Sequence, residues 1–174
     1  GYSGKTAIAI GDRGVREGLT SIGIVLNDDP GSISADLVVV GWDVNFDYRT
    51  MRRVSSTVRN GAKLFATNRD STFPAPEGLW PGAGAILASI EVASGHTAEI
   101  VGKPYPPMME AVARRMAGAR RIAAVGDRAD SDLAGAASMG WATILVLSGV
   151  TTRAEAESLD PPPDLMVDSV ADLG

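Results

Sequence analysis

Short apolar runs rich in β-branched residues alternate with helical patterns along the whole chain, and this alternation limits the fold more than any other feature. The runs predict strands at Ala7–Ile10, Asp36–Val40, Lys63–Ala66, Glu99–Val101, Arg121–Val125, Thr143–Leu147 and Leu165–Val167. The helical patterns begin near Val15, Tyr48, Gly84, Pro107, Ser131 and Thr152. Strands that alternate with helices are typical of crossover connections between parallel strands. The sequence therefore predicts an α/β fold with a largely parallel sheet.

The 174 residues suffice for one large domain or two small ones. We place a boundary between Gly95 and Gly102, where one series of strand–helix units ends and another begins, and divide the chain into residues 1–96 and 97–174. One stretch, Thr67 to Gly84, interrupts the alternation with three prolines and three glycines, and we interpret it as a long loop. Long loops inside compact domains are often functional.

Composition excludes several classes of function. The net charge of −5 argues against a nucleic-acid partner, which requires clustered Lys and Arg, but it permits a small phosphorylated ligand. The absence of cysteine removes thiolate nucleophiles and cysteine zinc sites, and it fits a cytoplasmic protein. His96 is the only histidine, which argues against a multi-histidine metal site. No apolar run approaches the ~20 residues of a membrane span, so we expect no membrane partner.

The segment Arg121–Asp132, RIAAVGDRADSD, carries the strongest local signal. Its strand delivers Gly126 and Asp127 to the carboxyl end, the edge at which ligands bind in open α/β sheets. A carboxylate there is a suitable ligand for Mg²⁺, which prefers oxygen donors. The alternative is that Asp130 or Ser131 only caps the following helix and Asp127 fills a turn. From these residues alone, both interpretations stay open.

A second signal is Gly102-Lys103-Pro104, which follows the predicted strand Glu99–Val101. A lysine at a strand end can supply a point charge to a phosphate oxygen, although a lysine in such a turn can also be simply solvated. Both signals lie on consecutive strand–helix units. We therefore expect Lys103 and Asp127 to share one edge of the sheet, as the outline of a phosphoryl-transfer site. The next helix carries Met108, Val112 and Met116 on one face, which predicts core packing.

The order of these motifs resembles the haloacid dehalogenase (HAD) superfamily of phosphatases. GKP, then about twenty residues, then GDRADSD and TILVLSGVT follow that family's pattern, and the match extends upstream through DLVVVGWDVNFDY, GAKLFATNRDSTFP and PGAGAILASIEVASG. More narrowly, the chain is similar to the NagD-like branch, which includes phosphoglycolate, pyridoxal phosphate, glycerol phosphate and p-nitrophenyl phosphatases.

The resemblance implies an α/β cap domain over residues 1–96 and the C-terminal half of a Rossmann-like HAD core with a parallel sheet over 97–174. It implies that Lys103 stabilises the phosphate, that Asp127 is a Mg²⁺ ligand, and that Asp132 supports Lys103 or a metal-bound water. The implied activity is Mg²⁺-dependent hydrolysis of a small phosphomonoester through an aspartyl-phosphate intermediate, as in related enzymes.

The resemblance also implies which part of the cap meets the substrate, a small phosphorylated metabolite. The loop Asn68 to Pro76 corresponds to the loop that such caps lower over the leaving group. Asn68, Arg69 and Asp70 are therefore the substrate-binding candidates.

The chain departs from the family at its front. Such enzymes begin with a strand that ends in Asp-x-Asp-Gly, which provides the nucleophile, and residues 1–174 contain no such motif. Asp12 and Asp43 fall in the cap by the same alignment and cannot replace it. We expect the nucleophile upstream and expect these 174 residues to be inactive alone. Without that central strand, Arg121–Val125 should show an unpaired edge and an exposed apolar face.

Two further possibilities concern assembly. A cluster of large side chains, Trp42, Phe46, Tyr48 and Met51, predicts either packing inside the cap or a symmetric homodimer through the cap, which the resemblance also suggests. The competing hypothesis for function is a non-catalytic oligomerisation or ligand-binding module derived from a phosphatase. A sugar- or nucleotide-binding α/β domain has support only from the fold class.

Overall fold

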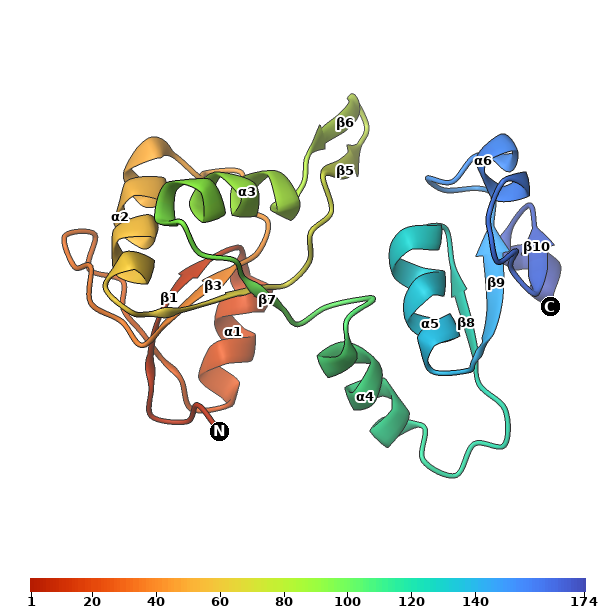
Figure 1. Ribbon diagram of the computed structural model, residues 1–174, viewed down its shortest axis with the longest axis horizontal. Helices are drawn as coiled ribbons and strands as arrows, with labels where there is room; N and C mark the ends of the chain where they lie inside the picture. Colours follow the sequence, from red (N-terminus) through yellow and green to blue (C-terminus); the bar gives the residue numbers. More distant parts are fainter. The chain divides into compact units, whose positions relative to one another are not determined.

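The computed structural model describes all residues, Gly1–Gly174, and the chain forms two compact units, residues 1–101 and 102–174 (Figure 1). The sequence analysis divided the chain five residues earlier. The difference is strand β7 (Glu99–Ile100), which pairs with β4 (Lys63–Ala66) in parallel and so belongs to the first unit. None of the helices is long and apolar enough to cross a membrane.

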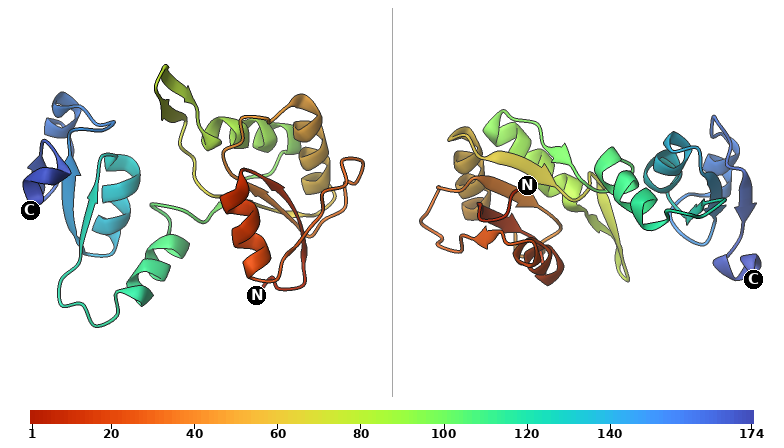
Figure 2. Two further views of the ribbon diagram at one scale, coloured as in Figure 1. Left: turned by 180° about the vertical axis from the view of Figure 1, so that it is seen from behind. Right: turned by 90° about the horizontal axis from the view of Figure 1, so that it is seen from below.

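The first unit is built on a five-stranded parallel sheet in the order β2-β1-β3-β4-β7. The remaining strands are β1 (Thr6–Ile10), β2 (Val25–Leu26) and β3 (Leu37–Val40). Helix α1 (Arg13–Ser21) covers one face, and helices α2 (Tyr48–Arg59) and α3 (Ala83–Ser94) pack together on the other (Figure 2). Because both faces are covered, all four residues of β3, Leu-Val-Val-Val, are buried.

The stretch interpreted as a loop contains an antiparallel hairpin, and this part of the sequence prediction was wrong. Strands β5 (Thr72–Ala75) and β6 (Gly78–Pro81) pair with Phe73 opposite Trp80. Prolines and glycines usually mark loops, but a two-stranded ribbon consists only of edge strands, which tolerate proline. The hairpin is tied to the loop after β3: Trp42 stacks on Phe73 with ring centroids 4.3 Å apart, and its indole N–H donates to the Pro81 carbonyl at 2.9 Å.

The second unit contains a three-stranded parallel sheet in the order β10-β9-β8. Its strands are β8 (Ala123–Gly126), β9 (Ala142–Val146) and β10 (Leu165–Val167). Its helical segments are α4 (Pro106–Arg115), a π-helical turn (Ala129–Leu133), α5 (Ala134–Ser138), α6 (Arg153–Glu157) and a 3₁₀ turn (Val170–Leu173).

Strand β8 forms an edge of this sheet and pairs only with β9. Val125 on β8 is 45% exposed, although its neighbours on the chain form an apolar run. The unpaired edge and the exposed apolar side chain agree with what the sequence predicted for Arg121–Val125. Natural sheets usually cover such an edge, since it invites pairing with another strand.

Helix α4 buries a different methionine from those predicted. Met108 and Met116 are 39% and 43% exposed, whereas Met109 is only 5% exposed. Met109 packs against Gly135 of α5, where a Cβ would lie 2.8 Å from the methionine sulfur. The predicted helix is present, but the face that packs carries Met109, which lies against the bare backbone of Gly135.

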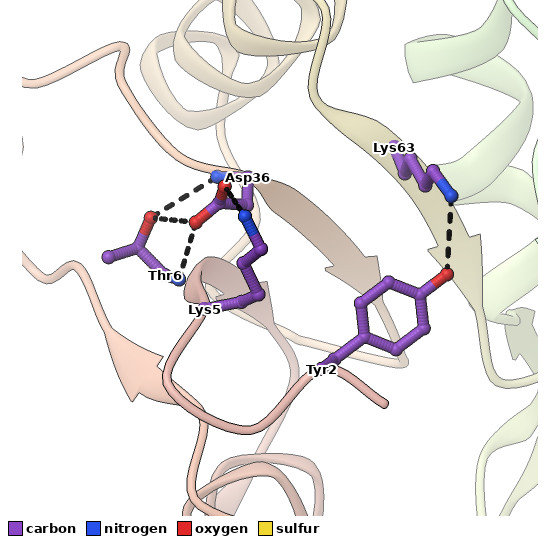
Figure 3. Close-up of polar contacts among 5 residues, drawn as sticks. All are labelled: Tyr2, Lys5, Thr6, Asp36 and Lys63. Carbon is purple, nitrogen blue, oxygen red and sulfur yellow. Dashed lines mark hydrogen bonds and ion pairs between the residues drawn. The ribbon is translucent and has the colours of Figure 1, made fainter.

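Both sheets join the beginnings of two neighbouring parallel strands with the same Thr–Asp contact. In the first unit, the backbone N–H and the hydroxyl of Thr6 donate to Asp36 Oδ2 at 2.8 and 3.0 Å (Figure 3). Lys5 adds an ion pair to the other carboxylate oxygen at 2.9 Å. In the second unit, Thr143 donates in the same way to Asp164 Oδ2 at 2.8 and 2.9 Å.

Candidate active site

The polar residues predicted to form a site in the second unit gather at the carboxyl edge of its sheet. Asp127 directly follows β8, and the loop Leu147–Thr152 follows β9. Because β8 and β9 are parallel, their carboxyl ends lie at the same edge. Lys103 reaches this unit through the turn that precedes α4.

Lys103 and Asp132 form an ion pair with Nζ 2.6 Å from Oδ1. The other carboxylate oxygen accepts a hydrogen bond from the backbone N–H of Arg128 at 3.2 Å. Both oxygens of Asp132 therefore have donors, and its side chain is only 11% exposed, whereas that of Lys103 is 55% exposed. A buried carboxylate thus orients an ammonium group that can still meet an anion.

Gly126 makes room for this ion pair. A Cβ at Gly126 would lie 2.3 Å from the Asp132 carboxylate, so no other residue fits at the end of β8 without moving that carboxylate. The glycine is therefore required by a close approach between backbone and side chain.

Asp127 is fixed by the loop that follows β9. Its Oδ2 accepts a hydrogen bond from the Val150 N–H at 2.8 Å, and its carbonyl accepts one from the Thr151 N–H at 3.1 Å. A Cβ at Gly149 would lie 2.0 Å from Oδ2. Sequence reasoning assigned no role to Gly149 or Val150, although a glycine shortly after a buried strand in LSGVT was a usable signal.

The route by which Lys103 reaches Asp132 differs from the prediction. The preceding strand β7 pairs with β4, so it shares no sheet with β8 and the two signals do not lie on neighbouring strands. The turn after β7 instead packs on α5, where a Cβ at Gly135 would lie 3.1 Å from Pro104 Cα. A small residue on α5 therefore admits the turn that carries Lys103.

The capping alternative for this segment does not match the structure. The π-helical turn begins at Ala129 after Arg128, with no side-chain cap. Asp130 is exposed and Ser131 is buried. It is Asp132 that satisfies a backbone N–H at the start of the turn.

The residues of this site provide one candidate ligand for a metal ion. No group of three or more acidic or histidine side chains is arranged to hold a metal. Asp127 offers a hard oxygen donor at the sheet edge with one oxygen already oriented by Val150. Mg²⁺ is commonly held by one or two carboxylates and keeps several waters, so Asp127 suits one ligand position for this ion.

The substrate-binding candidates Asn68, Arg69 and Asp70 lie in the first unit at the base of the β5–β6 hairpin. Asn68 Oδ1 accepts a hydrogen bond from the Asp70 N–H at 3.0 Å, which closes a tight turn. The Arg69 guanidinium makes two hydrogen bonds to Glu91, at 2.9 and 2.6 Å. Sequence reasoning assigned no role to Glu91.

Comparisons with known proteins agree with this architecture. A family model described as HAD-hydrolase-like matches residues 100–173. An acid sugar phosphatase of Staphylococcus saprophyticus is 37% identical over 92% of this chain, and this chain spans 61% of that relative's length.

Solved structures of phosphatases also match nearly the whole chain. A glycerol phosphate phosphatase of Mycobacterium tuberculosis in complex with calcium is 28% identical with a TM-score of 0.87, over 98% of this chain and 51% of that one, and its complex with magnesium also matches. A p-nitrophenyl phosphatase of Archaeoglobus fulgidus is 29% identical with a TM-score of 0.82, over 97% of this chain and 66% of that one. The chain belongs to the haloacid dehalogenase superfamily, and within it to the NagD-like branch.

Proposed function

We propose that the intact protein hydrolyses a small phosphomonoester, with the first unit as the cap and the second as part of the catalytic core. The observation that carries this proposal is the Lys103–Asp132 ion pair at the same sheet edge as Asp127. A cation and a metal-binding carboxylate placed together suit the negative charge of a phosphoryl group. The phosphatase names of the relatives support the same reaction class.

In this proposal, Lys103 binds a phosphoryl oxygen through its ammonium group. Asp132 holds that group in place, and the Arg128 N–H fixes the rotamer of Asp132. Charge that develops on the phosphoryl oxygens then meets a donor that is already oriented, so little reorganisation is needed during the reaction.

Asp127 would hold Mg²⁺ with the carboxylate that Val150 orients. The ion, when bound, supplies positive charge that neutralises the phosphoryl group. The magnesium and calcium complexes of the mycobacterial relative support a divalent cation in this role.

We propose that the nucleophile is an aspartate outside residues 1–174, upstream in the polypeptide. Its carboxylate oxygen forms a bond to phosphorus while the bond to the leaving alcohol breaks, and an acid protonates that alcohol. Water then cleaves the aspartyl phosphate and releases inorganic phosphate. The unpaired edge of β8 supports a further strand beside it, and the 61% coverage of a curated relative leaves length for such a segment.

The first unit would serve recognition. The segment Asn68–Asp70 and the hairpin that follows it would contact the leaving group, and closure of a cap would exclude bulk water from the reaction. We further propose a homodimer through this unit. Trp80 and Phe46 line a hollow of ≈ 400 Å³, and Tyr48 nearby is 75% exposed, which is the kind of aromatic surface that dimers bury.

The direct test measures hydrolysis of p-nitrophenyl phosphate by the intact protein with Mg²⁺ and with EDTA. We expect turnover that requires the metal. Lys103→Gln should lower kcat/KM by roughly 100-fold or more, as expected when a preorganised charge is removed from the transition state. Lys63→Gln, at an exposed lysine of the first unit, is the matched control and should retain activity. Wild-type turnover by the Lys103 variant would exclude the proposed role.

A further inference from the structure

Glu91 of α3 contacts two segments outside its own helix. Its Oε1 accepts hydrogen bonds from Arg69 Nη2 at 2.6 Å and from the Ala98 N–H at 2.7 Å, and its Oε2 accepts one from Arg69 Nη1 at 2.9 Å. The Glu91 side chain is only 17% exposed. One carboxylate therefore connects the segment before the hairpin, helix α3 and the entry to β7.

The base of the hairpin lies directly against the start of α3. The Gly84 N–H donates to the Asp70 carbonyl at 2.8 Å, and the Gly82 N–H donates to the Ser71 carbonyl at 2.9 Å. A Cβ at Gly84 would lie 2.2 Å from the Arg69 carbonyl, so only glycine permits this approach. The backbone is thus held at the two glycines, and the side chain of Arg69 is held two helical turns further along α3.

The contact between Glu91 and Arg69 depends on the negative charge of Glu91. Burial by itself raises the pKa of Glu91, but the hydrogen bonds from Arg69 and from the Ala98 N–H lower it, and the pKa lies below its ordinary value. The carboxylate is therefore ionised at neutral pH and forms a two-point contact with the guanidinium. Such forked pairs are stronger and more specific in geometry than single contacts.

We propose that Glu91 is a positioning residue for substrate recognition, which acts through Arg69 to hold the Asn68–Asp70 segment and the hairpin base against α3. The role in recognition rests on the proposed function, in which this segment contacts the leaving group. Glu91 itself does not touch the substrate. Its loss lets the recognising segment move and weakens substrate binding, while the Lys103–Asp132 pair and Asp127 stay intact.

Glu91→Gln in the intact protein tests this directly. Glutamine keeps an oxygen for the Ala98 N–H but removes the charge that binds Arg69. We expect KM for p-nitrophenyl phosphate to rise roughly tenfold with kcat unchanged, because a charged hydrogen-bonded pair is lost outside the reacting centre. We also expect faster hydrogen exchange at the Gly82 and Gly84 amides. The matched control is Glu17→Gln, which breaks an exposed ion pair with Arg13 and should change neither quantity.

A double-mutant cycle with Arg69→Met distinguishes positioning from a general effect on stability. If Glu91 acts through Arg69, Glu91→Gln adds little to KM in the Arg69→Met background. The proposal would be overturned if the two substitutions changed KM independently. An unchanged KM, or unchanged hydrogen exchange at the Gly82 and Gly84 amides, in Glu91→Gln would also overturn it. If the wild-type protein hydrolyses no phosphomonoester, the proposed function fails. In that case, hydrogen exchange at the Gly82 and Gly84 amides still shows whether Glu91 holds the hairpin base.

Discussion

At the scale of single residues, two glycines determine where the acids of the candidate site lie. Gly126 leaves room for the Asp132 carboxylate, and Gly149 leaves room for Asp127. Neither glycine has a positive φ, so neither is required by backbone conformation. Their role is steric. The acids lie against backbone that carries no side chain, and hydrogen bonds from the Arg128 and Val150 N–H groups orient their carboxylates.

This steric role predicts that Gly149→Ala resembles Asp127→Asn. The added methyl group would lie 2.0 Å from Asp127 Oδ2, so the carboxylate must move away from the Val150 N–H. We expect both variants of the intact protein to need more Mg²⁺ for half-maximal turnover and to lose activity by roughly tenfold or more. A magnesium titration of p-nitrophenyl phosphate hydrolysis measures this.

The matched control is Gly18→Ala in α1, where a Cβ meets no atom within 4 Å. It should leave the magnesium titration unchanged, and alanine should slightly stabilise the helix. A Gly149→Ala variant with a wild-type titration would show that Asp127 does not bind the metal in the orientation described.

At the scale of elements, the two Thr–Asp contacts fix the register of neighbouring parallel strands at their first residues. Hydrogen bonds from the Thr6 backbone N–H and from Lys5 lower the pKa of Asp36 to about 2 (Figure 3). The Thr143 backbone N–H and hydroxyl likewise lower the pKa of Asp164. Each carboxylate is more acidic in the folded chain than in an unfolded one, so its ionisation favours folding.

The lowered pKa values predict that the folded protein loses stability in acid over a defined pH range. Stability from Asp36 is fully present above its ordinary pKa of 3.8 and is lost as the pH falls toward about 2. Asp36→Asn should lower the Tm at neutral pH and flatten the decline of Tm between these two values. Thermal unfolding of the intact protein at several pH values checks this.

Asp28→Asn is the matched control for this experiment, since Asp28 pairs only with Arg16 at the surface. It should retain the wild-type decline of Tm in acid. If Asp36→Asn and wild type decline in parallel, the Thr6 contact does not contribute to the acid sensitivity of the fold.

At the scale of the whole molecule, the second unit has a parallel sheet with an open edge. Strand β8 pairs on one side only, and its Val125 is half-exposed, while Leu145 and Val146 of β9 are buried. An exposed apolar edge at the very strand that leads to Asp127 fits a core to which a further strand is added.

The proposed function, with its nucleophile upstream, predicts that these 174 residues alone are inactive. They contain no aspartate in the family's nucleophile motif, so p-nitrophenyl phosphate should not be hydrolysed, whereas the intact polypeptide should be active. Both are assayed under the same magnesium concentration. Magnesium-dependent turnover by the purified 174-residue chain would contradict this prediction and would place the nucleophile among the residues described here.

The proposed homodimer predicts that Phe46→Asp dissociates the intact protein. Phe46 lies in the hollow lined by Trp42 and Trp80, and a carboxylate there would be costly to bury. Sedimentation velocity should show a dimer for wild type and a monomer for the variant. Ile22→Asp, at an exposed residue after α1, is the control and should stay dimeric. A monomeric wild type, or a dimeric Phe46 variant, would argue against this interface.

The sequence by itself indicated seven of the ten strands, because strands of parallel sheets leave local runs of apolar, β-branched residues, and it missed β2, β5 and β6. It located β4 and β10 with their observed bounds, and it placed Asp127 and Lys103 at the ends of apolar runs. The tertiary structure alone decided which strands pair. It assigned β7 to the first unit and converted a proline-rich stretch into a hairpin.

Within the site as well, the sequence showed which residues follow strands, and the tertiary structure decided which residues contact each other. Apolar periodicity showed that Asp127 follows a strand, but it carried no information on Gly149, Val150 or the Glu91–Arg69 pair. Those contacts join residues about twenty positions apart, and they depend on how closely two backbones approach each other. Local pattern reports whether a residue is buried, whereas close approach is a property of packing between segments, which only the folded chain defines.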